Sequence, residues 1–352
     1  MGEGRTRVLS IDALRGFVVA AMLVVNNPGR PELAPYQLGH APWGQGITFT
    51  DLVMPWFLFV IGVSLPFAIE PARGKPGLWR KAVTRCIALL VLGILLVSSA
   101  NHRLVIGLDV LQHLGLAGLF ATIVYVHAGQ RRWLVCIGIL VAHWALLRFS
   151  GPLGEHDNVI ARLNREYLAP LHLAGLVSPV ATTALVLFGT YAGQWLRDQD
   201  LTIDRRSRRM LLAGSIAGVI GWIWHYDIFF SKALWTAPYL LFAGGLGMIL
   251  LALAHLLVEG RGFKALAFPF TVLGRNAILA YFGAIVIKHH TVDEWRTTSS
   301  TGMETSMRDA IVARYVEVFG GPLGSFTWTA TWLLLVWLAC LWLYRRGVFW
   351  KL

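Results

Sequence analysis

The sequence predicts an all-α protein, a polytopic membrane bundle of about ten transmembrane helices that forms one domain over residues 1–352. Three observations lead to this prediction. Hydrophobic residues make up 56% of the chain and charged residues only 14%, which is more apolar surface than a soluble domain can bury. The apolar residues gather in runs close to the roughly 20 residues that a helix needs to cross a bilayer. Many of the 15 Trp residues stand near the ends of these runs, as in an interfacial aromatic belt.

The apolar runs give the expected order of the helices. They cover approximately residues 10–27, 50–69, 84–100, 109–128, 133–149, 179–196, 209–227, 234–257, 270–288 and 326–344. Most connections between them are short, so neighbouring helices should pack antiparallel. Three connections are long, at residues 28–49, 150–178 and 289–325. We expect irregular loops there, which are usually functional in a compact protein, and we expect all three on one face.

The distribution of basic residues predicts the topology. The chain has a net charge of +12 with 31 Lys and Arg, of which 19 fall in the segments on the side of the N-terminus and ten in the longer segments opposite. This asymmetry is what the positive-inside rule describes. We therefore expect both termini to be cytoplasmic, and the positive charge requires no nucleic-acid partner.

Several site types lack a signature in the sequence. The three cysteines, Cys86, Cys136 and Cys340, lie inside apolar runs without metal-ligand spacing. There is no Walker A or dinucleotide-binding glycine pattern. Histidines on the predicted outer side, His102 and the pair His289 and His290 among them, share no ligand spacing on a single helix. We therefore expect no metal.

Charged residues near the predicted cytoplasmic side have two interpretations. In "SIDALRGF", Asp12 and Arg15 are three residues apart and share one helix face. In "LGRNAILAYF", Arg275 and Asn276 stand near the start of the ninth span. An arginine in a membrane span costs about 2.5–3.5 kcal/mol on insertion scales, so it needs a reason. These residues either form structural ion pairs and caps, or contact a phosphorylated ligand that enters from the cytoplasm.

A polar stretch at the predicted outer side, "HAPWGQGITFTD", brings three chemically useful side chains to the start of the second span. His40 can act as a general base because its pKa is near neutrality. Asp51 can fix its tautomer, and Trp43 offers a stacking surface. Asn26, in "VVNNPGR", ends the first span on the same side. The alternative interpretation of this stretch is an ordinary Gly- and Pro-rich loop.

A second polar stretch, "HYDIFFSKALWTAPY", sets Asp227, Lys232 and Trp235 around an outer turn. The simplest expectation is an ion pair between Asp227 and Lys232. The other interpretation is a set of contacts for a polar substrate.

Long stretches of the chain resemble the heparan-α-glucosaminide N-acetyltransferase family of transmembrane acyltransferases. The similarity is carried in matching order by "SIDALRGF", "VVNNPG", "HAPWGQGITFTDLVMPWFLFVIGVS", "DVLQHLGL", "SKALWTAPYLL", "LGRNAILAYFG" and "LYRRGVFWKL". The resemblance implies transfer of an acetyl group from cytoplasmic acetyl-CoA to an amino sugar across the membrane. It places the family's active-site histidine on His40 and its functional asparagine on Asn26, and it implies a homodimer.

The chain also departs from the family's eukaryotic members. It reads "LHLAGLVSPVATTALVLFG" where those members carry an acidic Asp-Pro-Glu-Gly stretch, so we expect a different acceptor. The sequence shows no luminal domain ahead of the first span and no cleavable signal. We therefore expect a bacterial relative in the inner (plasma) membrane.

The sequence thus predicts a transmembrane acetyltransferase that uses acetyl-CoA as donor and a glycan on the far side as acceptor. The expected catalytic residues are His40, Asn26 and Asp51; the expected donor contacts are Arg15, Arg275, Asn276 and Asp12; the expected acceptor contacts are Trp43, Asp227, Lys232 and Trp235. The alternatives are a transporter or flippase of a polar or lipid-linked envelope molecule, and an O-acyltransferase acting on a cell-envelope polysaccharide. A purely structural scaffold explains the buried polar residues least well.

Overall fold

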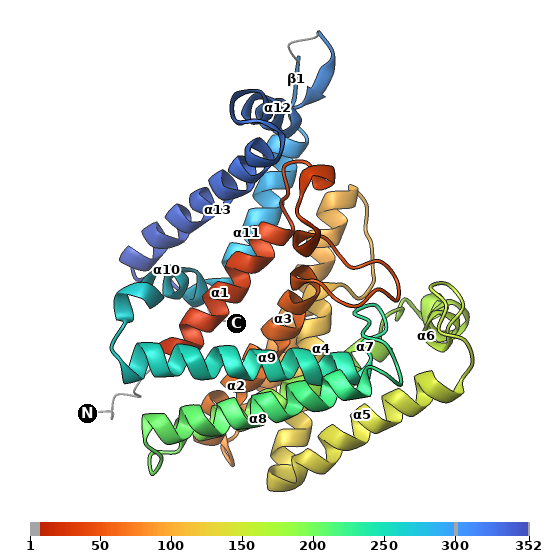
Figure 1. The fold of residues 1–352 in the computed structure, drawn as a ribbon, viewed down its shortest axis with the longest axis vertical. Helices are drawn as coiled ribbons and strands as arrows, with labels where there is room; N and C mark the ends of the chain where they lie inside the picture. Colours follow the sequence, from red (N-terminus) through yellow and green to blue (C-terminus); the bar gives the residue numbers. More distant parts are fainter. Residues whose placement is uncertain (1–7, 299–301, 351–352) are drawn as a thin grey trace.

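The protein is a bundle of long helices in the computed structural model, which describes residues 8–298 and 302–350 (Figure 1). Helices form at all ten places where the sequence predicts a span. They are α1 (Leu9–Val25), α2 (Phe49–Ile69), α3 (Leu78–Asn101), α4 (Val110–Ala128), α5 (Arg132–Phe149), α7 (Val177–Arg197), α8 (Ile203–Trp224), α9 (Ala237–His255), α10 (Lys264–Arg275) with α11 (Ala277–Lys288), and α13 (Gly321–Arg345). The all-helical prediction is confirmed, apart from one short hairpin.

The number of membrane crossings is confirmed only in part. Over the described residues, five helical segments are long and apolar enough to cross a membrane, and six if the bent pair α10–α11 forms one span. One of the five, Val110–Phe149, is 40 residues long and contains both α4 and α5. Helix α1 is only 17 residues long, and α8 begins with four arginines and an aspartate. The chain is therefore a membrane protein, while ten crossings and cytoplasmic termini remain predictions.

The ninth predicted span is not a single helix. It begins at Lys264, breaks at Asn276, and the two parts enclose a bend of 66°. The cause is tertiary: the Asn276 side chain donates to the carbonyl of Val348 (3.1 Å) and accepts from the amide of Trp350 (2.9 Å). The buried asparagine thus ties the break to the C-terminal segment.

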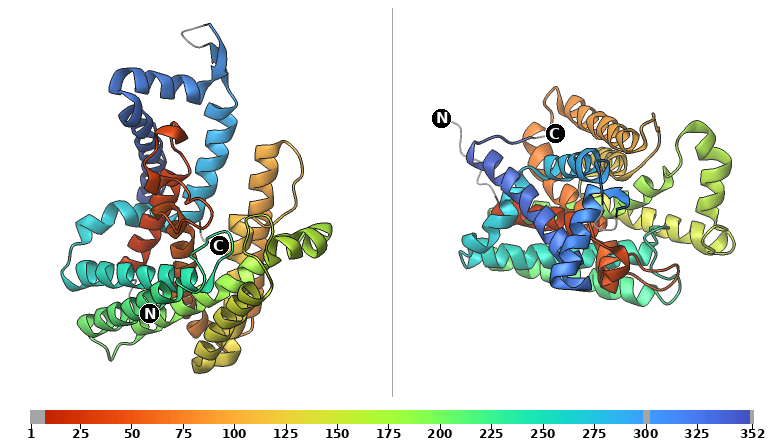
Figure 2. Two further views of the ribbon diagram at one scale, coloured as in Figure 1. Left: turned by 45° about the vertical axis from the view of Figure 1, so that its right-hand side comes forward. Right: turned by 90° about the horizontal axis from the view of Figure 1, so that it is seen from above.

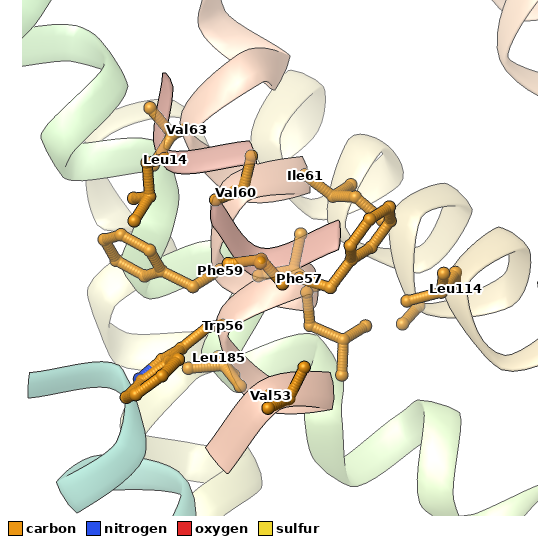
Figure 3. Close-up of a cluster of buried hydrophobic side chains, with 14 of the residues drawn as sticks. Leu14, Val53, Trp56, Phe57, Phe59, Val60, Ile61, Val63, Leu114 and Leu185 are labelled. Atoms are coloured by element: carbon orange, nitrogen blue, oxygen red, sulfur yellow. The ribbon is translucent and has the colours of Figure 1, made fainter. Parts of the chain in front are cut away.

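Helix α2 lies at the centre of the hydrophobic core (Figure 3). Its side chains, among them Phe57, Phe59 and Ile61, are almost fully buried against α1, α4, α7 and α9. Gly62 lets α7 approach closely, because a Cβ there would stand 2.0 Å from the carbonyl oxygen of Val186. Helices α8 and α9 lie side by side (Figures 1 and 2), and α9 also packs on α2. The core therefore holds α2, and with it Asp51, in a fixed position.

The three long connections contain more regular structure than predicted. Residues 28–48 form two short 3-10 turns, and residues 150–178 form α6 (Val159–Leu163) and further helical turns. Residues 289–320 form a π-helical turn, η8 (His289–Asp293), an antiparallel hairpin of β1 (Arg296–Thr298) and β2 (Glu304–Ser306), and α12 (Met307–Phe319). The prediction of an irregular loop is wrong for this last segment, which α12 stabilises by packing on α13.

The same three connections meet one another, as expected for segments on one face. The indole N–H of Trp43 donates to the carbonyl of Leu153 (3.0 Å), which joins the first connection to the second. The guanidinium of Arg308 donates to the carbonyls of Pro28 (2.9 Å) and Gly29 (3.1 Å), which joins the first to the third. Residues 28–48, which carry His40, are therefore held from both sides.

Candidate functional site

The N-terminus of α2 builds the site. Thr48 is the N-cap residue and Asp51 stands at the third helical position, so the two form a capping box. The Asp51 carboxylate is 3% exposed. Its Oδ2 accepts from the backbone amides of Ala41 and Thr48, both at 3.1 Å. The hydroxyl of Tyr239 donates to the backbone carbonyl of Asp51 (2.5 Å). A carboxylate with these partners has a fixed orientation.

The fixed carboxylate holds the imidazole of His40. His40 Nδ1 lies 2.6 Å from Asp51 Oδ1, and the ring itself is 61% exposed. An ionised carboxylate only accepts, so this contact assigns the proton to Nδ1. Nε2 is then unprotonated, with its lone pair available to accept a proton. The pair expected from the sequence is thus present in the geometry of a general base and its orienting acid.

Lys232 completes the group from the other side. Its Nζ lies 3.4 Å from His40 Nδ1, on the segment between α8 and α9. Burial lowers the pKa of Lys232 below its usual value, and the negative charge of Asp51 opposes this effect. Asp51 therefore accepts a hydrogen bond from His40 and lies close enough to Lys232 to act as its counter-charge. A cation in this position can stabilise a negative charge that develops beside His40.

The prediction of an ion pair between Asp227 and Lys232 is wrong. Asp227 accepts from the indole N–H of Trp144 (2.5 Å) and from the guanidinium of Arg148 (3.2 Å), both on α5. It is directed toward α5 because Trp144 and Arg148 stand one turn apart on that helix. This pairing leaves Lys232 directed at His40.

The two tryptophans near the site have structural contacts. Trp43 donates a hydrogen bond to Leu153, as described above. Its ring also packs edge-on against the ring of Phe229, with 6.1 Å between the two ring centres. Trp235 is 6% exposed and packs on His113 and Tyr239. Its φ of +51° is rare for a bulky residue. Such strain clusters at functional sites, and here it marks the segment that presents Lys232.

The two asparagines at the end of α1 differ in environment. Asn27 is buried, and its side chain donates to the carbonyl of Leu23 (2.6 Å). Asn26 is the exposed C-cap residue, and its backbone amide bonds to Met22. The hydrogen bonds of the described residues do not join Asn26 to His40. The predicted catalytic role of Asn26 therefore stays a prediction.

At the other end of the bundle, Asp12 and Arg15 form the ion pair that their spacing predicts, at 3.1 Å. Arg15 also donates to Ser64 Oγ on α2 (2.8 Å) and approaches the carbonyl of Gly274 on α10 (3.4 Å). Arg15 therefore joins three helices, and its side chain is 27% exposed.

Arg275 is occupied by aromatic rings. Its guanidinium lies 3.5 Å from the ring centre of Phe349 and 4.9 Å from that of Tyr344. Together with the hydrogen bonds of Asn276 described above, these contacts fasten residues 344–350 to the break between α10 and α11. The side chains of Arg275 and Asn276 therefore contact the C-terminal segment of the chain.

A large cavity opens between the halves of α2, α3 and α4 that lie away from His40. Its volume is about 920 Å³, and its walls are mostly apolar, with Leu65, Leu89 and Gly118 among the lining residues. Arg80, Lys81 and Arg85 line it at the start of α3. The sequence analysis did not predict a role for these three residues, because they enter it only in the count of basic residues that predicts the topology. Arg85 is also close enough to Arg15 for their charges to interact.

Comparison with known proteins assigns a family to the part of the chain that contains His40 and Asp51. The family model described as heparan-alpha-glucosaminide N-acetyltransferase, catalytic, matches residues 7–211. Human heparan-alpha-glucosaminide N-acetyltransferase is 23% identical over 423 residues, which cover 98% of this chain and 60% of the human protein. The mouse protein is 21% identical over 422 residues, with the same coverage of 98% and 60%. The chain thus spans about 60% of the length of these relatives.

Proposed function

Because the chain belongs to the heparan-alpha-glucosaminide N-acetyltransferase catalytic family, we propose that it is a transmembrane acetyltransferase. It moves an acetyl group from acetyl-CoA on the cytoplasmic side to an amino sugar or glycan on the other side. The observation that carries this proposal is the pair His40–Asp51, with Nδ1 held at 2.6 Å by a buried carboxylate and the ring exposed. The basic cavity at the opposite end of α2 supports it.

The cavity is suited to the donor. Arg80 and Lys81 at its rim would bind the phosphates of acetyl-CoA, and the apolar walls would receive the uncharged pantetheine arm. Ile61 is the lining residue of α2 nearest in sequence to Asp51. Ten residues of helix separate them, which is about 15 Å. The arm therefore has to bring the thioester about 15 Å beyond the cavity to reach His40.

In this proposal the other residues predicted to contact the donor do not bind its phosphates directly. Arg15, oriented by Asp12, adds positive charge beside Arg85 and draws the donor toward α2. Arg275 and Asn276 act by fixing residues 344–350 at the same end of the bundle. Their own contacts are to the chain, so we assign the direct phosphate contacts to Arg80 and Lys81.

His40 Nε2 would act as the general base. It removes a proton from the acceptor amine while the amine nitrogen attacks the thioester carbonyl carbon, and the carbonyl oxygen becomes an oxyanion. Collapse of this intermediate breaks the C–S bond, and the proton on His40 passes to the leaving thiolate. Lys232 and Asn26 would stabilise the oxyanion, a type of contact worth about 2.7–4 kcal/mol elsewhere.

A variant of this route forms a covalent intermediate. His40 Nε2 attacks the thioester first and becomes acetylated, free CoA leaves, and the acceptor then takes the acetyl group. Asp51 has the same function in both routes, since it keeps Nε2 directed at the reacting carbon. Ping-pong kinetics would distinguish this variant from direct transfer.

The acceptor would approach the exposed edge of His40. Asp227 offers a carboxylate at the surface, and Trp43 offers a half-buried ring. Trp235 is buried, so it would act by holding the segment that presents Lys232. An amino sugar presents a neutral amine, the form that can attack the thioester, and hydroxyls that such residues can bind. Inner-membrane localisation and a homodimeric assembly belong to the same proposal.

The test is release of free CoA by the purified protein in detergent, with acetyl-CoA and glucosamine. We expect glucosamine-dependent release by the wild type and none by His40→Ala. His156→Ala, a change to an exposed histidine in the second long connection, is the matched control and should behave as wild type. Failure of the wild type to bind acetyl-CoA would contradict the proposal and favour a transporter. Binding without turnover would leave the family assignment intact but contradict glucosamine as the acceptor.

A further inference from the structure

A second group of histidines and a carboxylate lies at the ends of α3 and α11, within the predicted outer side. It consists of His102, which caps the C-terminus of α3, His289 and His290 in η8, and Glu294 directly after η8. We call it the α3–α11 cluster. The residues come from two segments far apart in the sequence, and none of them takes part in the chemistry assigned to His40.

The distances in the cluster match those of a metal site. His102 Nε2 lies 2.9 Å and His289 Nε2 3.0 Å from the same oxygen, Glu294 Oε1. The three ligand atoms all lie within 4.8 Å of one another. Zinc bonds of roughly 2.0–2.1 Å in a tetrahedron put neighbouring ligand atoms about 3.3 Å apart. An ion fits between these atoms with small side-chain adjustments.

Two polar atoms of the cluster are buried without hydrogen bonds. His289 Nε2 and Glu294 Oε1 are both shielded from solvent, and among the described residues neither has a hydrogen-bond partner, although they are 3.0 Å apart. Buried polar atoms without partners are rare and call for an explanation. Two such atoms, 3.0 Å apart and without a hydrogen bond between them, are candidates for ligands of one metal ion.

The backbone around the cluster is unusual at both contributing segments. His102 has a φ of +50°, which is uncommon for a residue other than glycine. His289 and His290 belong to a π-helical turn, a conformation that is frequent at functional sites. The two irregularities together bring three imidazoles to one carboxylate.

The fourth residue holds the carboxylate in place. His290 Nδ1 lies 3.1 Å from Glu294 Oε2, and the other ring nitrogen of His290 contacts the hydroxyl of Ser99 on α3. Glu294 Oε2 is therefore engaged by His290, and Oε1 is left for an ion. Hydrogen-bonded partners of this kind orient the ligands in most metal sites.

We propose that His102 Nε2, His289 Nε2 and Glu294 Oε1 bind a zinc ion. Two imidazoles and one carboxylate suit zinc, whereas magnesium and calcium prefer oxygen ligands. Three protein ligands leave a fourth position for water. The ion joins the end of α3 to the end of α11 and so steadies residues 289–320, which contact the His40 segment through Arg308.

The experiment uses the full chain purified in detergent, stripped with EDTA, dialysed and incubated with ZnCl₂. Bound metal is measured by inductively coupled plasma mass spectrometry. We expect about one zinc ion per chain, lost in Glu294→Gln and His102→Gln and kept in His156→Gln. His290→Gln should weaken binding by about 10–100-fold, since it removes only the partner of the carboxylate. Zinc retained equally by Glu294→Gln would overturn the assignment.

A spectroscopic measurement covers the case in which a variant fails to fold. Co²⁺ added to the stripped wild type should give the intense visible bands of a four-coordinate ion, and ZnCl₂ should abolish them. The weak spectrum of hydrated Co²⁺, unchanged by the protein, would contradict the site. Excess MgCl₂ should leave the cobalt bands unchanged, and their loss in MgCl₂ would contradict the choice of metal.

Discussion

The chain contains two groups in which histidine meets a carboxylate, and they are built in opposite ways. At His40, one exposed imidazole bonds to a buried carboxylate that backbone amides and a capping threonine hold in place. In the α3–α11 cluster, three imidazoles surround a partly exposed carboxylate, and two of them face the same oxygen. Both groups consist of imidazoles and a carboxylate, but they differ in the number of imidazoles per carboxylate and in the burial of the carboxylate.

The difference explains the roles that we assign. A single imidazole with one nitrogen fixed leaves the other nitrogen free to take a proton, which suits acid–base catalysis. In the second group, two imidazole nitrogens lie within 3.0 Å of one carboxylate oxygen, and three ligand atoms this close together suit a metal ion. Each of the following predictions should affect one group and spare the other.

The largest effect is expected at the carboxylate of the first group. Asp51→Asn should lower kcat by about 10³–10⁴-fold, because the amide no longer fixes the proton on His40 Nδ1, as in catalytic triads. The KM for acetyl-CoA should change little. The measurement is steady-state CoA release, with Asp157→Asn, a change to an exposed aspartate in the second long connection, as the matched control. An activity for Asp51→Asn within tenfold of the wild type would contradict the role of Asp51 in orienting His40. Zinc content should stay at the wild-type level.

A smaller effect is expected at Lys232. Lys232→Met should lower kcat by about 10²-fold, since it removes a charge beside the developing oxyanion. The pH profile provides a sharper test. Because burial lowers the pKa of Lys232, the ammonium loses its charge at a lower pH than an ordinary lysine does, and activity should fall there. Lys232→Arg keeps its charge and should move this alkaline limb to higher pH. An unchanged alkaline limb in Lys232→Arg would exclude Lys232 from the chemistry.

Zinc should affect stability through the second group only. At a free zinc concentration 100 times its Kd, binding to the native state adds about 2.7 kcal/mol to the free energy of unfolding. The corresponding rise in apparent Tm should occur in the wild type and in His40→Ala, and should be absent in Glu294→Gln. A rise that persists in Glu294→Gln would place the ion elsewhere.

The smallest effect is expected at the basic cavity. The double change Arg80→Ala with Lys81→Ala should raise the KM for acetyl-CoA by about tenfold, or 1.4 kcal/mol, with kcat nearly unchanged. Arg131→Ala with Arg209→Ala removes the same charge from exposed positions outside the cavity and is the matched control. Equal effects of the two pairs would show that only the overall charge matters.

Local sequence patterns predicted the helices and the contact between His40 and Asp51. Apolar runs placed the helices, and His40 and Asp51 stand only 11 residues apart in one short segment. The break at Asn276 was missed because it depends on hydrogen bonds to residues 348 and 350. The partner of Asp227 lies on α5, and the ligands of the α3–α11 cluster come from distant segments. No spacing rule joins residues that only the packing of helices brings together.

The central claim is that donor and acceptor reach His40 from opposite ends of the bundle. Proteoliposomes test it with labelled acetyl-CoA trapped inside and a glucosamine-containing oligosaccharide, too large to cross the bilayer, outside. The account predicts labelled product in this arrangement, lost in His40→Ala, and only background when both substrates are on the same side. Product with both substrates on one side, and none across the membrane, would contradict it.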